Sequence, residues 1–245
     1  MNIRDELRSL LTRGGRFVLA AAVVGAATGF AVAGFERLTV NVVFNHIVSK
    51  LAVGALAFAP AVGLLVTALW LRGPGHGASP ATADEYLDAF HTDRTLAVRT
   101  MIHRVIASVA TLGSGNAMGL EGPSIYLGAT IGQAAQRRFR VLFRGADRNL
   151  LLVAGAAAGI AAIFKAPATG AVFALEVPYQ DDLARRMLLP ALVAGASGYL
   201  ALVAVNGTGP LFPVSGTPPL SFADLAGAAA LGLAAALGAR VFARM

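Results

Sequence analysis

The chain contains 245 residues, of which 56% are hydrophobic and only 13% are charged, and its mean hydropathy is +0.68. Because a soluble domain carries about 25% charged residues, this composition indicates a membrane protein. The formal net charge is +7, but the basic residues cluster between apolar segments with few aromatic residues among them. We therefore expect loops oriented by the positive-inside rule and no nucleic-acid binding. The absence of cysteine excludes disulfides and thiolate metal sites.

The N-terminal residues predict a surface helix followed by a long membrane helix. Residues 1–14 place apolar side chains at helical spacing on a charged peptide, which is typical of a helix lying along a membrane surface. An apolar run from Phe17 to Phe35 follows, close to the length of about 20 residues that a spanning helix needs. The basic residues before this run resemble a signal peptide, but the apolar pattern resumes after two charged residues. We therefore expect one uncleaved, tilted helix over roughly 16–48.

Further apolar segments predict three more spans, at 51–71, 96–112 and 183–205. The first of these ends at the stretch "RGPGHGASP", residues 72–80, in which glycine and proline are too dense for a helix. A short helix is predicted over residues 81–91, capped by Ser79 with Pro80 in its first turn.

The sequence after residue 118 predicts one uninterrupted helix and two short ones. The uninterrupted helix is expected over 119–139, and a basic stretch at 137–148 follows it. Two apolar pieces at 149–164 and 166–177 are each too short to span a membrane alone, which suggests half-helices that enter the membrane and turn back. A last apolar segment begins near Phe222.

Pairs of glycines four residues apart predict close contacts between helices, because small residues let helix backbones approach each other in lipid. We expect these pairs to be packing seams. They are Gly25 and Gly29, Gly115 and Gly119, Gly128 and Gly132, and Gly155 and Gly159.

The distribution of basic residues predicts a cytoplasmic N-terminus. With the N-terminus inside, the loops at 72–95, 137–148 and 178–186 are inside as well. The second of these loops holds five arginines, and the third holds Arg185 and Arg186.

Glu121 is unusual because its surroundings are apolar. A carboxylate at membrane depth costs about 2.5–3.5 kcal/mol on insertion scales, so Glu121 is expected to be paired, neutral or beside a water-filled pathway. The stretch "GLEGP", residues 119–123, marks a helix start, where unpaired N–H groups and a partial positive charge favour an anion. A carboxylate tethered there can occupy the place of a diffusible anion. The alternative is that Glu121 only caps its own helix near an exposed end.

A second interrupted stretch, residues 73–80, also opens a short helix. Two helix starts that converge near the middle of the membrane would form an anion site from their backbone dipoles. The sequence contains no arrangement of nucleophile and base, no phosphate-loop signature and no histidines at ligand spacing. We therefore expect neither an enzyme nor a bound metal or cofactor.

Two motifs resemble the CLC family of chloride channels and chloride/proton antiporters. The stretch "GLEGPSIYLGATIG", residues 119–132, resembles the family's G(K/R)EGP motif, and "GAAAGIAAIFKAPATGAVFALEV", residues 155–177, resembles a longer family segment. The likeness covers essentially the whole chain as one transmembrane domain. It implies an all-α, polytopic fold built as an inverted repeat with broken and re-entrant helices, of which about the first half plus one helix is present. In this interpretation residues 16–220 are the first repeat, and residues 221–245 start a second repeat that is truncated.

The resemblance implies that Glu121 gates the anion pathway. It also implies that the backbone around Gly119, Leu120, Gly122 and Pro123 contributes to anion binding.

The loop of Gly73, Pro74 and Gly75 stands where the family has a loop whose serine contacts the central anion. Pro74 takes the place of that serine, and family members with proline there tend to favour nitrate. The resemblance therefore implies chloride or a similar anion, with nitrate possible. The alternative is that these residues form an ordinary turn rich in glycine and proline.

Val177 departs from the pattern of the family's antiporters, in which two adjacent glutamates end the second motif and the second of them relays protons. Here Glu176 is followed by a valine, which cannot carry a proton. The departure favours passive, channel-like conduction, although Glu176 or water could serve as the proton path in an antiporter. Lys165 stands where the family's second motif has an asparagine before Ala-Pro. Its long side chain is expected either to extend to the membrane interface or to attract anions.

The resemblance also implies partners and a location. The expected partners are an anion, the lipid bilayer and a second copy of the chain, since family members form homodimers through segments like 149–177 and 183–205. A multi-pass protein of the plasma membrane is expected. The family's anion site also uses a G-x-F-x-P helix start and a late tyrosine that this sequence lacks. Two interpretations therefore remain: part of an anion channel or transporter, or a truncated, non-conducting membrane scaffold.

Overall fold

The computed structural model describes residues 3–79, 82–92, 94–141, 143, 148–179, 185–209 and 221–244. In this part of the chain every regular element is a helix, which confirms the predicted all-α fold. The elements in chain order are α1 (Ile3–Glu36), the π-helix η1 (Arg37–Ile47), the 3₁₀-helix η2 (Val48–Lys50), α2 (Val53–Arg72), α3 (Ala83–His91), α4 (Val98–Gly113), α5 (Glu121–Arg138), α6 (Leu150–Phe164), α7 (Pro167–Glu176), the 3₁₀-helix η3 (Arg185–Met187), α8 (Leu188–Asn206) and α9 (Phe222–Phe242).

The chain divides into two compact units, residues 1–208 and residues 209–245. The second unit contains α9, which begins at a capping box. The Ser221 hydroxyl accepts a hydrogen bond from the Asp224 N–H at 3.2 Å, and the Asp224 carboxylate accepts one from the Ser221 N–H at 3.2 Å. Both bonds satisfy N–H groups that a helix start leaves without partners.

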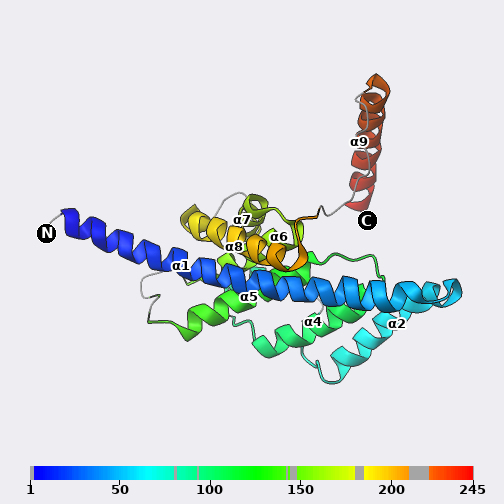
Figure 1. Cartoon of the computed structure of the whole chain (residues 1–245), viewed down its shortest axis with the longest axis horizontal. Helices are drawn as coiled ribbons and strands as arrows, with labels where there is room; N and C mark the ends of the chain where they lie inside the picture. Colours follow the sequence, from blue (N-terminus) through cyan, green and yellow to red (C-terminus); the bar gives the residue numbers. More distant parts are fainter. Residues whose placement is uncertain are drawn as a thin grey trace. The chain divides into compact units, whose positions relative to one another are not determined.

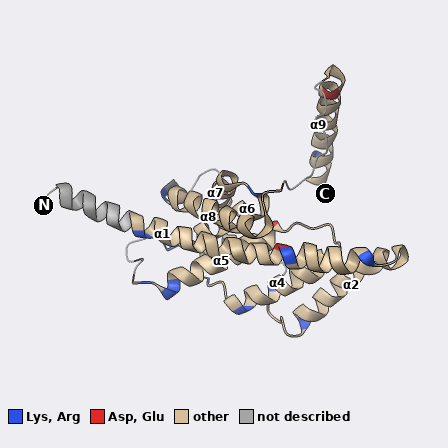
Figure 2. Cartoon of the chain, in the orientation of Figure 1, with Lys and Arg blue, Asp and Glu red and all other residues tan. Residues whose placement is uncertain are grey.

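Among the residues that the structure describes, four helical stretches are long and apolar enough to cross a membrane, namely Gly15–Lys50, Val53–Arg72, Leu188–Asn206 and Phe222–Phe242. Each lies where the sequence predicts an apolar span. The predicted break between two shorter apolar helices is confirmed as well, because α6 ends at Phe164 and α7 begins at Pro167. Figure 2 shows charged residues mostly at helix ends and in connections, with long uncharged stretches between them.

The centre of the first unit is α6. Every residue from Leu150 to Ile163 is buried, and α1, α5, α7 and α8 pack around them. A helix that is apolar on all sides is expected in such a position. Figure 1 shows α1 running along the unit, with α6, α7 and α8 on one side of it and α2 and α4 on the other.

The predicted glycine seams join α5 to α6 and α1 to α8. A Cβ atom on Gly155 of α6 would overlap the backbone oxygen of Gly128 in α5. A Cβ atom on Gly29 of α1 would overlap the backbone oxygen of Gly198 in α8. The helix backbones therefore touch directly at these glycines, as the spacing of small residues predicts.

One predicted seam is wrong. Gly115 and Gly119 lie between α4 and α5, outside both helices. The positive φ of Gly115, +92°, belongs to the turn that follows α4. A spacing of four residues therefore indicates a helix seam only where the intervening residues are helical.

The structure also changes two expectations about helix starts. α1 is continuous from Ile3, so no break separates residues 3–14 from the first span, and the predicted position of residues 1–14 on a membrane surface stays a prediction. α3 has Thr82 as its N-cap residue in place of Ser79, and the predicted Pro80 lies outside the described residues. The later start places two acidic residues in the first turn of α3, where the helix dipole favours them.

The two charged residues that interrupt the first apolar run bind the end of α8. The Asn206 side-chain amide donates to the Glu36 carboxylate at 2.7 Å, and the Arg37 guanidinium donates to the Val205 carbonyl at 2.7 Å. These polar groups thus find partners within the helix pair, while the first span continues through them as η1.

Candidate functional site

Glu121 is the first residue of α5, and it lines a cavity of about 310 Å³. Its carboxylate folds back over Gly119, because a Cβ atom on Gly119 would overlap it. Within the described residues this carboxylate has no hydrogen bond or ion pair. The cavity is lined by Thr67, Leu71, Ser79, Thr82, Arg104, Ala107, Ser108, Thr111, Leu112, Met118, Gly119, Glu121, Gly122 and Pro123.

The starts of α3 and α5 meet at this cavity. Thr82, the N-cap residue of α3, lies against the first turn of α5, where a Cβ atom on Gly122 would overlap the Thr82 hydroxyl. The Thr82 side chain accepts no hydrogen bond from the N–H groups of α3, and Leu120 has no polar side chain that could cap α5. Both helices therefore present N–H groups and partial positive charge toward the same space.

Local sequence explains why α5 begins at Glu121. The turn after α4 contains Gly115, and the third residue of α5 is Pro123, which has no N–H group of its own and so suits the first turn of a helix. The Ser124 N–H and hydroxyl both donate to the Leu120 carbonyl, at 3.1 and 2.7 Å. These bonds close the first turn behind the carboxylate.

Hydroxyl groups from α2 and α4 form another wall of the cavity. The hydroxyls of Thr67 and Thr111 lie 2.7 Å apart and also lie 3.1 and 3.0 Å from the Ala107 carbonyl oxygen, so their two protons serve two of these three contacts. Ser108 lies on the same helix and also lines the cavity. Because the Thr67 and Thr111 protons serve contacts within this wall, Ser108 is the one of these three hydroxyls that can donate to an anion and replace part of its hydration shell.

Arg104 brings a buried positive charge to the wall. Its side chain is 3% exposed, donates to the Glu85 carboxylate of α3 at 2.5 Å and stacks over the Tyr126 ring of α5 at 4.2 Å. Glu85 also lies 3.7 Å from Arg94. The sequence analysis did not single out Arg104, although an arginine within the apolar segment 96–112 is a signal of the same kind as Glu121.

The structure brings together only some of the residues proposed from the resemblance. Glu121, Gly119, Gly122 and Pro123 all line the cavity, whereas Leu120 packs against a small apolar cluster beside it.

Gly73, Pro74 and Gly75 form a turn at the end of α2 and are not among the residues lining the cavity. The Gly75 N–H donates to the Trp70 carbonyl at 2.9 Å, which closes this turn against α2. Ser79, later in the same loop, lines the cavity. The anion-binding role of Gly73, Pro74 and Gly75 stays a prediction.

The residues that bear on proton coupling lie at the end of α7. Glu176 is its last residue and is exposed, while Val177 is half-buried and packs against the main apolar core. Neither residue lines the cavity at Glu121.

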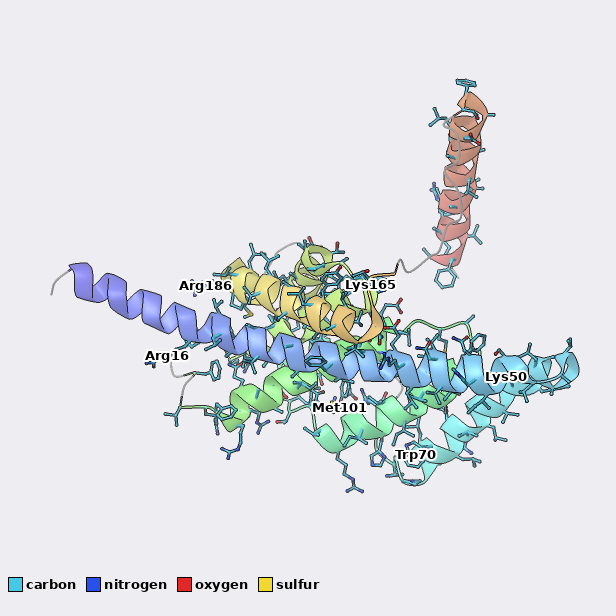
Figure 3. The ribbon with its side chains drawn as sticks, viewed as in Figure 1. Arg16, Lys50, Trp70, Met101, Lys165 and Arg186 are labelled. Carbon is cyan, nitrogen blue, oxygen red and sulfur yellow. The ribbon has the colours of Figure 1, made fainter. Side chains whose placement is uncertain are left out.

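Lys165 ends α6 in a left-handed conformation, with φ of 54°. Its ammonium group donates to the Gly207 carbonyl at 3.5 Å, just after α8. Figure 3 shows Lys165 and Arg186 toward opposite ends of the group formed by α6, α7 and α8. Lys165 is not among the residues that line the cavity, which agrees better with a role at the interface than with attraction of an anion to this cavity.

Comparison with known families gives one match over most of the chain. A family model described as voltage gated chloride channel matches residues 62–245. This range includes the loop at 73–80, Glu121 and the interrupted pair of helices α6 and α7.

Two curated relatives are similar to the chain over shorter ranges. The voltage-gated ClC-type chloride channel ClcB of Escherichia coli is 32% identical over 174 residues, which cover 66% of this chain and 41% of that protein. The chloride channel protein CLC-d of Arabidopsis thaliana is 38% identical over 102 residues, which cover 37% of this chain and 13% of that protein. The chain thus matches less than half the length of either relative.

Two solved structures share the fold. A CLC-type fluoride/proton antiporter is 20% identical with a TM-score of 0.69, and the match covers 84% of this chain and 51% of that one. A slow cyanobacterial Cl⁻/H⁺ antiporter is 22% identical with a TM-score of 0.64, and the match covers 83% of this chain and 51% of that one.

Proposed function

Because the chain belongs to the family of voltage-gated chloride channels, the CLC family, we propose that it forms one side of an anion pathway through the membrane. In this proposal Glu121 is the gate of the pathway. The observation that carries it is the meeting of two helix starts, those of α3 and α5, around the Glu121 carboxylate in one cavity. A negative charge at that place is favoured by both helix dipoles, whether it belongs to the carboxylate or to a dissolved anion.

The gate works by competition between two anions for one place. While the Glu121 carboxylate is charged, it occupies the position beside Gly119 and excludes a diffusible anion. Protonation of the carboxylate removes this attraction, so the side chain can leave and an anion can enter. The carboxylate has no partner within the described residues that would hold it in place.

The anion is held by N–H and O–H donors around the cavity. The backbone of Gly119, Leu120 and Gly122 provides N–H groups at the start of α5, and Pro123 shapes this first turn. On the α3 side, Thr82 lines the cavity. The turn of Gly73, Pro74 and Gly75 is a second candidate contact for the anion, outside this cavity. The cargo is chloride or a similar anion, with nitrate as the main competitor.

A second set of helices, on the same or on another polypeptide, completes the pathway in this proposal. The support is the length of the match, which covers about half of each solved CLC structure. The competing interpretation is a non-conducting scaffold that uses the fold only for packing and partner binding.

Channel-like conduction is favoured over proton-coupled exchange by the position of Val177. Its side chain packs against the apolar core, and the neighbouring Glu176 is exposed at the end of α7. A proton that moves inside the protein from the cavity to the end of α7 therefore finds no carboxylate at position 177 to carry it. The competing candidate is an antiporter that uses Glu176, and the two similar solved structures are antiporters by description.

We also propose a homodimer in the plasma membrane with the N-terminus in the cytoplasm. α6 is enclosed, so the exposed apolar side chains available for a dimer come from α7 and α8, including Phe173 and Leu200. Arg16 and Arg186 lie toward the same end of the first unit in Figure 3, which agrees with one basic, cytoplasmic side.

The test is anion flux into liposomes that contain the purified protein, measured with labelled chloride at acidic and neutral pH. Glu121→Gln imitates the protonated gate, so flux is expected to become insensitive to pH and to remain high at neutral pH. Asp84→Asn is the control, because Asp84 is exposed on α3 and is not among the cavity residues. Unchanged pH dependence in Glu121→Gln contradicts the gate, and no flux from any form supports the scaffold.

A further inference from the structure

A second cavity lies at the far end of α5 from Glu121. Its volume is about 440 Å³, and its described lining residues include none that line the cavity at Glu121. Among the described residues four arginines line it, from the connection between α3 and α4, the last turn of α5, the residues just after α5 and the segment before α6. They are Arg94, Arg137, Arg140 and Arg148.

Hydrogen bonds between different elements brace the wall of this cavity. The Gln136 side-chain oxygen accepts from the Leu151 N–H at 2.8 Å, and the Asn149 side-chain amide donates to the Phe90 carbonyl at 2.7 Å. Gln136 and Asn149 are both only 8% exposed. The wall is therefore held by buried amides that fix the ends of α5 and α3 against the start of α6.

The Gln133 side chain joins the segment that carries Arg94 to α5. Its side-chain oxygen accepts from the Leu96 N–H at 2.7 Å, and its amide group donates to the Arg94 carbonyl at 3.1 Å. The Arg137 guanidinium, one turn further along α5, donates to the Thr95 hydroxyl. The segment from Arg94 to Leu96 is thus anchored to α5.

The described residues that line the cavity include the four arginines and no acidic residue. Arg94 is paired outside the lining, with the Asp88 carboxylate at 2.8 Å. The Arg148 guanidinium lies 3.4 Å from the carbonyl oxygens of His91 and Thr92. Arg140 is exposed and makes no ion pair with another described residue, so its guanidinium is available to a ligand. Several arginines facing one space suit a ligand with several anionic oxygens.

We propose that this cavity binds a phosphate group, presented either by the headgroup of an anionic phospholipid or by a soluble phosphate compound. The planar guanidinium forks of Arg137 and Arg140 match the spacing of phosphate oxygens, which permits two parallel hydrogen bonds from each. The cavity lies where α5 ends and its basic connection begins, which is where the headgroups of a bilayer are expected. The binding stabilises the junction of α3, α5 and α6.

The experiment uses the full chain purified in detergent. Native mass spectrometry measures retention of phosphatidylglycerol against phosphatidylcholine, and calorimetry measures binding of inorganic pyrophosphate. We expect retention of phosphatidylglycerol, weakened about tenfold in Arg140→Gln by the loss of one charge-assisted hydrogen-bonding group.

Arg138→Gln is the matched control. It removes the same charge from the same end of α5, but Arg138 lies over the Phe139 ring at 5.8 Å and does not line the cavity. Its phosphatidylglycerol retention is expected to equal that of the unaltered chain.

The outcomes separate the two sources of phosphate. Retention of phosphatidylglycerol without pyrophosphate binding supports the lipid headgroup, and pyrophosphate binding that is weakened in Arg140→Gln supports the soluble compound. Equal loss in Arg138→Gln and Arg140→Gln overturns the proposal, because it would reflect surface charge alone. No preference for phosphatidylglycerol together with no pyrophosphate binding also overturns it. No anion flux is measured, so the result is independent of the proposed gate at Glu121.

Discussion

The Arg104 guanidinium and the Glu85 carboxylate form an ion pair of 2.5 Å that joins α4 to α3 beside the cavity at Glu121. Glu85 is the third residue of α3 and lies in its first turn, three positions after the N-cap residue Thr82. The pair therefore fixes the helix start that faces Gly122 of α5. Because Arg104 also lies over the Tyr126 ring of α5, this ion pair links α3, α4 and α5 beside the proposed gate.

The first prediction concerns this ion pair. Removal of one partner from a buried pair leaves the other charge uncompensated, so Glu85→Gln is expected to lower the free energy of unfolding by about 3 kcal/mol. Chemical unfolding of the purified protein in detergent measures it. Asp84→Asn, at an exposed neighbouring position of α3, is expected to change the stability by no more than about 0.5 kcal/mol. Similar losses in both variants would show that the pair does not matter.

The second prediction concerns the contact between α5 and α6. A Cβ atom at position 155 would overlap the Gly128 backbone oxygen, which cannot move without shifting α5. Gly155→Ala is therefore expected to destabilise the protein by about 1–3 kcal/mol, the cost of overpacking a tight core. Gly227→Ala in α9 meets no atom within 4 Å and should be neutral or slightly stabilising, because alanine favours helices. A neutral Gly155→Ala would mean that the seam is looser than described.

The third prediction concerns the position of the gate. A Cβ atom at position 119 would overlap the Glu121 carboxylate, which is the end of a flexible side chain. Gly119→Ala is therefore expected to displace the carboxylate, raise anion flux at neutral pH several-fold and leave thermal stability almost unchanged. Gly34→Ala is the control, since no atom lies within 4 Å of its added Cβ. Flux with the original pH dependence in Gly119→Ala would contradict the proposed position of the gate.

Local signals were sufficient to predict several features of the fold and the site. The helix start at Glu121 follows from the glycines and proline around it, and the break near Lys165 follows from the Ala-Pro that comes after it. The close packing at Gly128 and at Gly155 follows from the spacing of small residues, although the pairing of these two glycines with each other does not. Each of these features depends on backbone chemistry within a few residues.

Features that depend on which helices pair could not be predicted in the same way. Arg104 reaches the cavity wall because α4 packs beside α3 and α5, and no local pattern in α4 states this pairing. The resemblance implies an anion contact at Pro74 in the connection after α2, which stays a prediction, and the residues of this connection that line the cavity are Ser79 and Thr82. The path of an irregular loop depends on contacts at both of its ends, so a motif match alone does not locate its residues.

The fourth prediction concerns proton coupling. Val177 is apolar and packs against the core, so a chloride gradient across liposomes is expected to drive no uphill proton movement through the protein. The measurement is the external pH during chloride efflux, with the membrane potential clamped by a potassium ionophore. In Glu176→Gln the chloride flux should remain unchanged, because Glu176 is exposed at the end of α7 and does not line the cavity at Glu121. If protons instead move uphill and Glu176→Gln abolishes that movement, the protein is an exchanger that uses Glu176, and channel-like conduction is wrong. If they move uphill in Glu176→Gln as well, channel-like conduction is also wrong, and the proton path does not depend on Glu176.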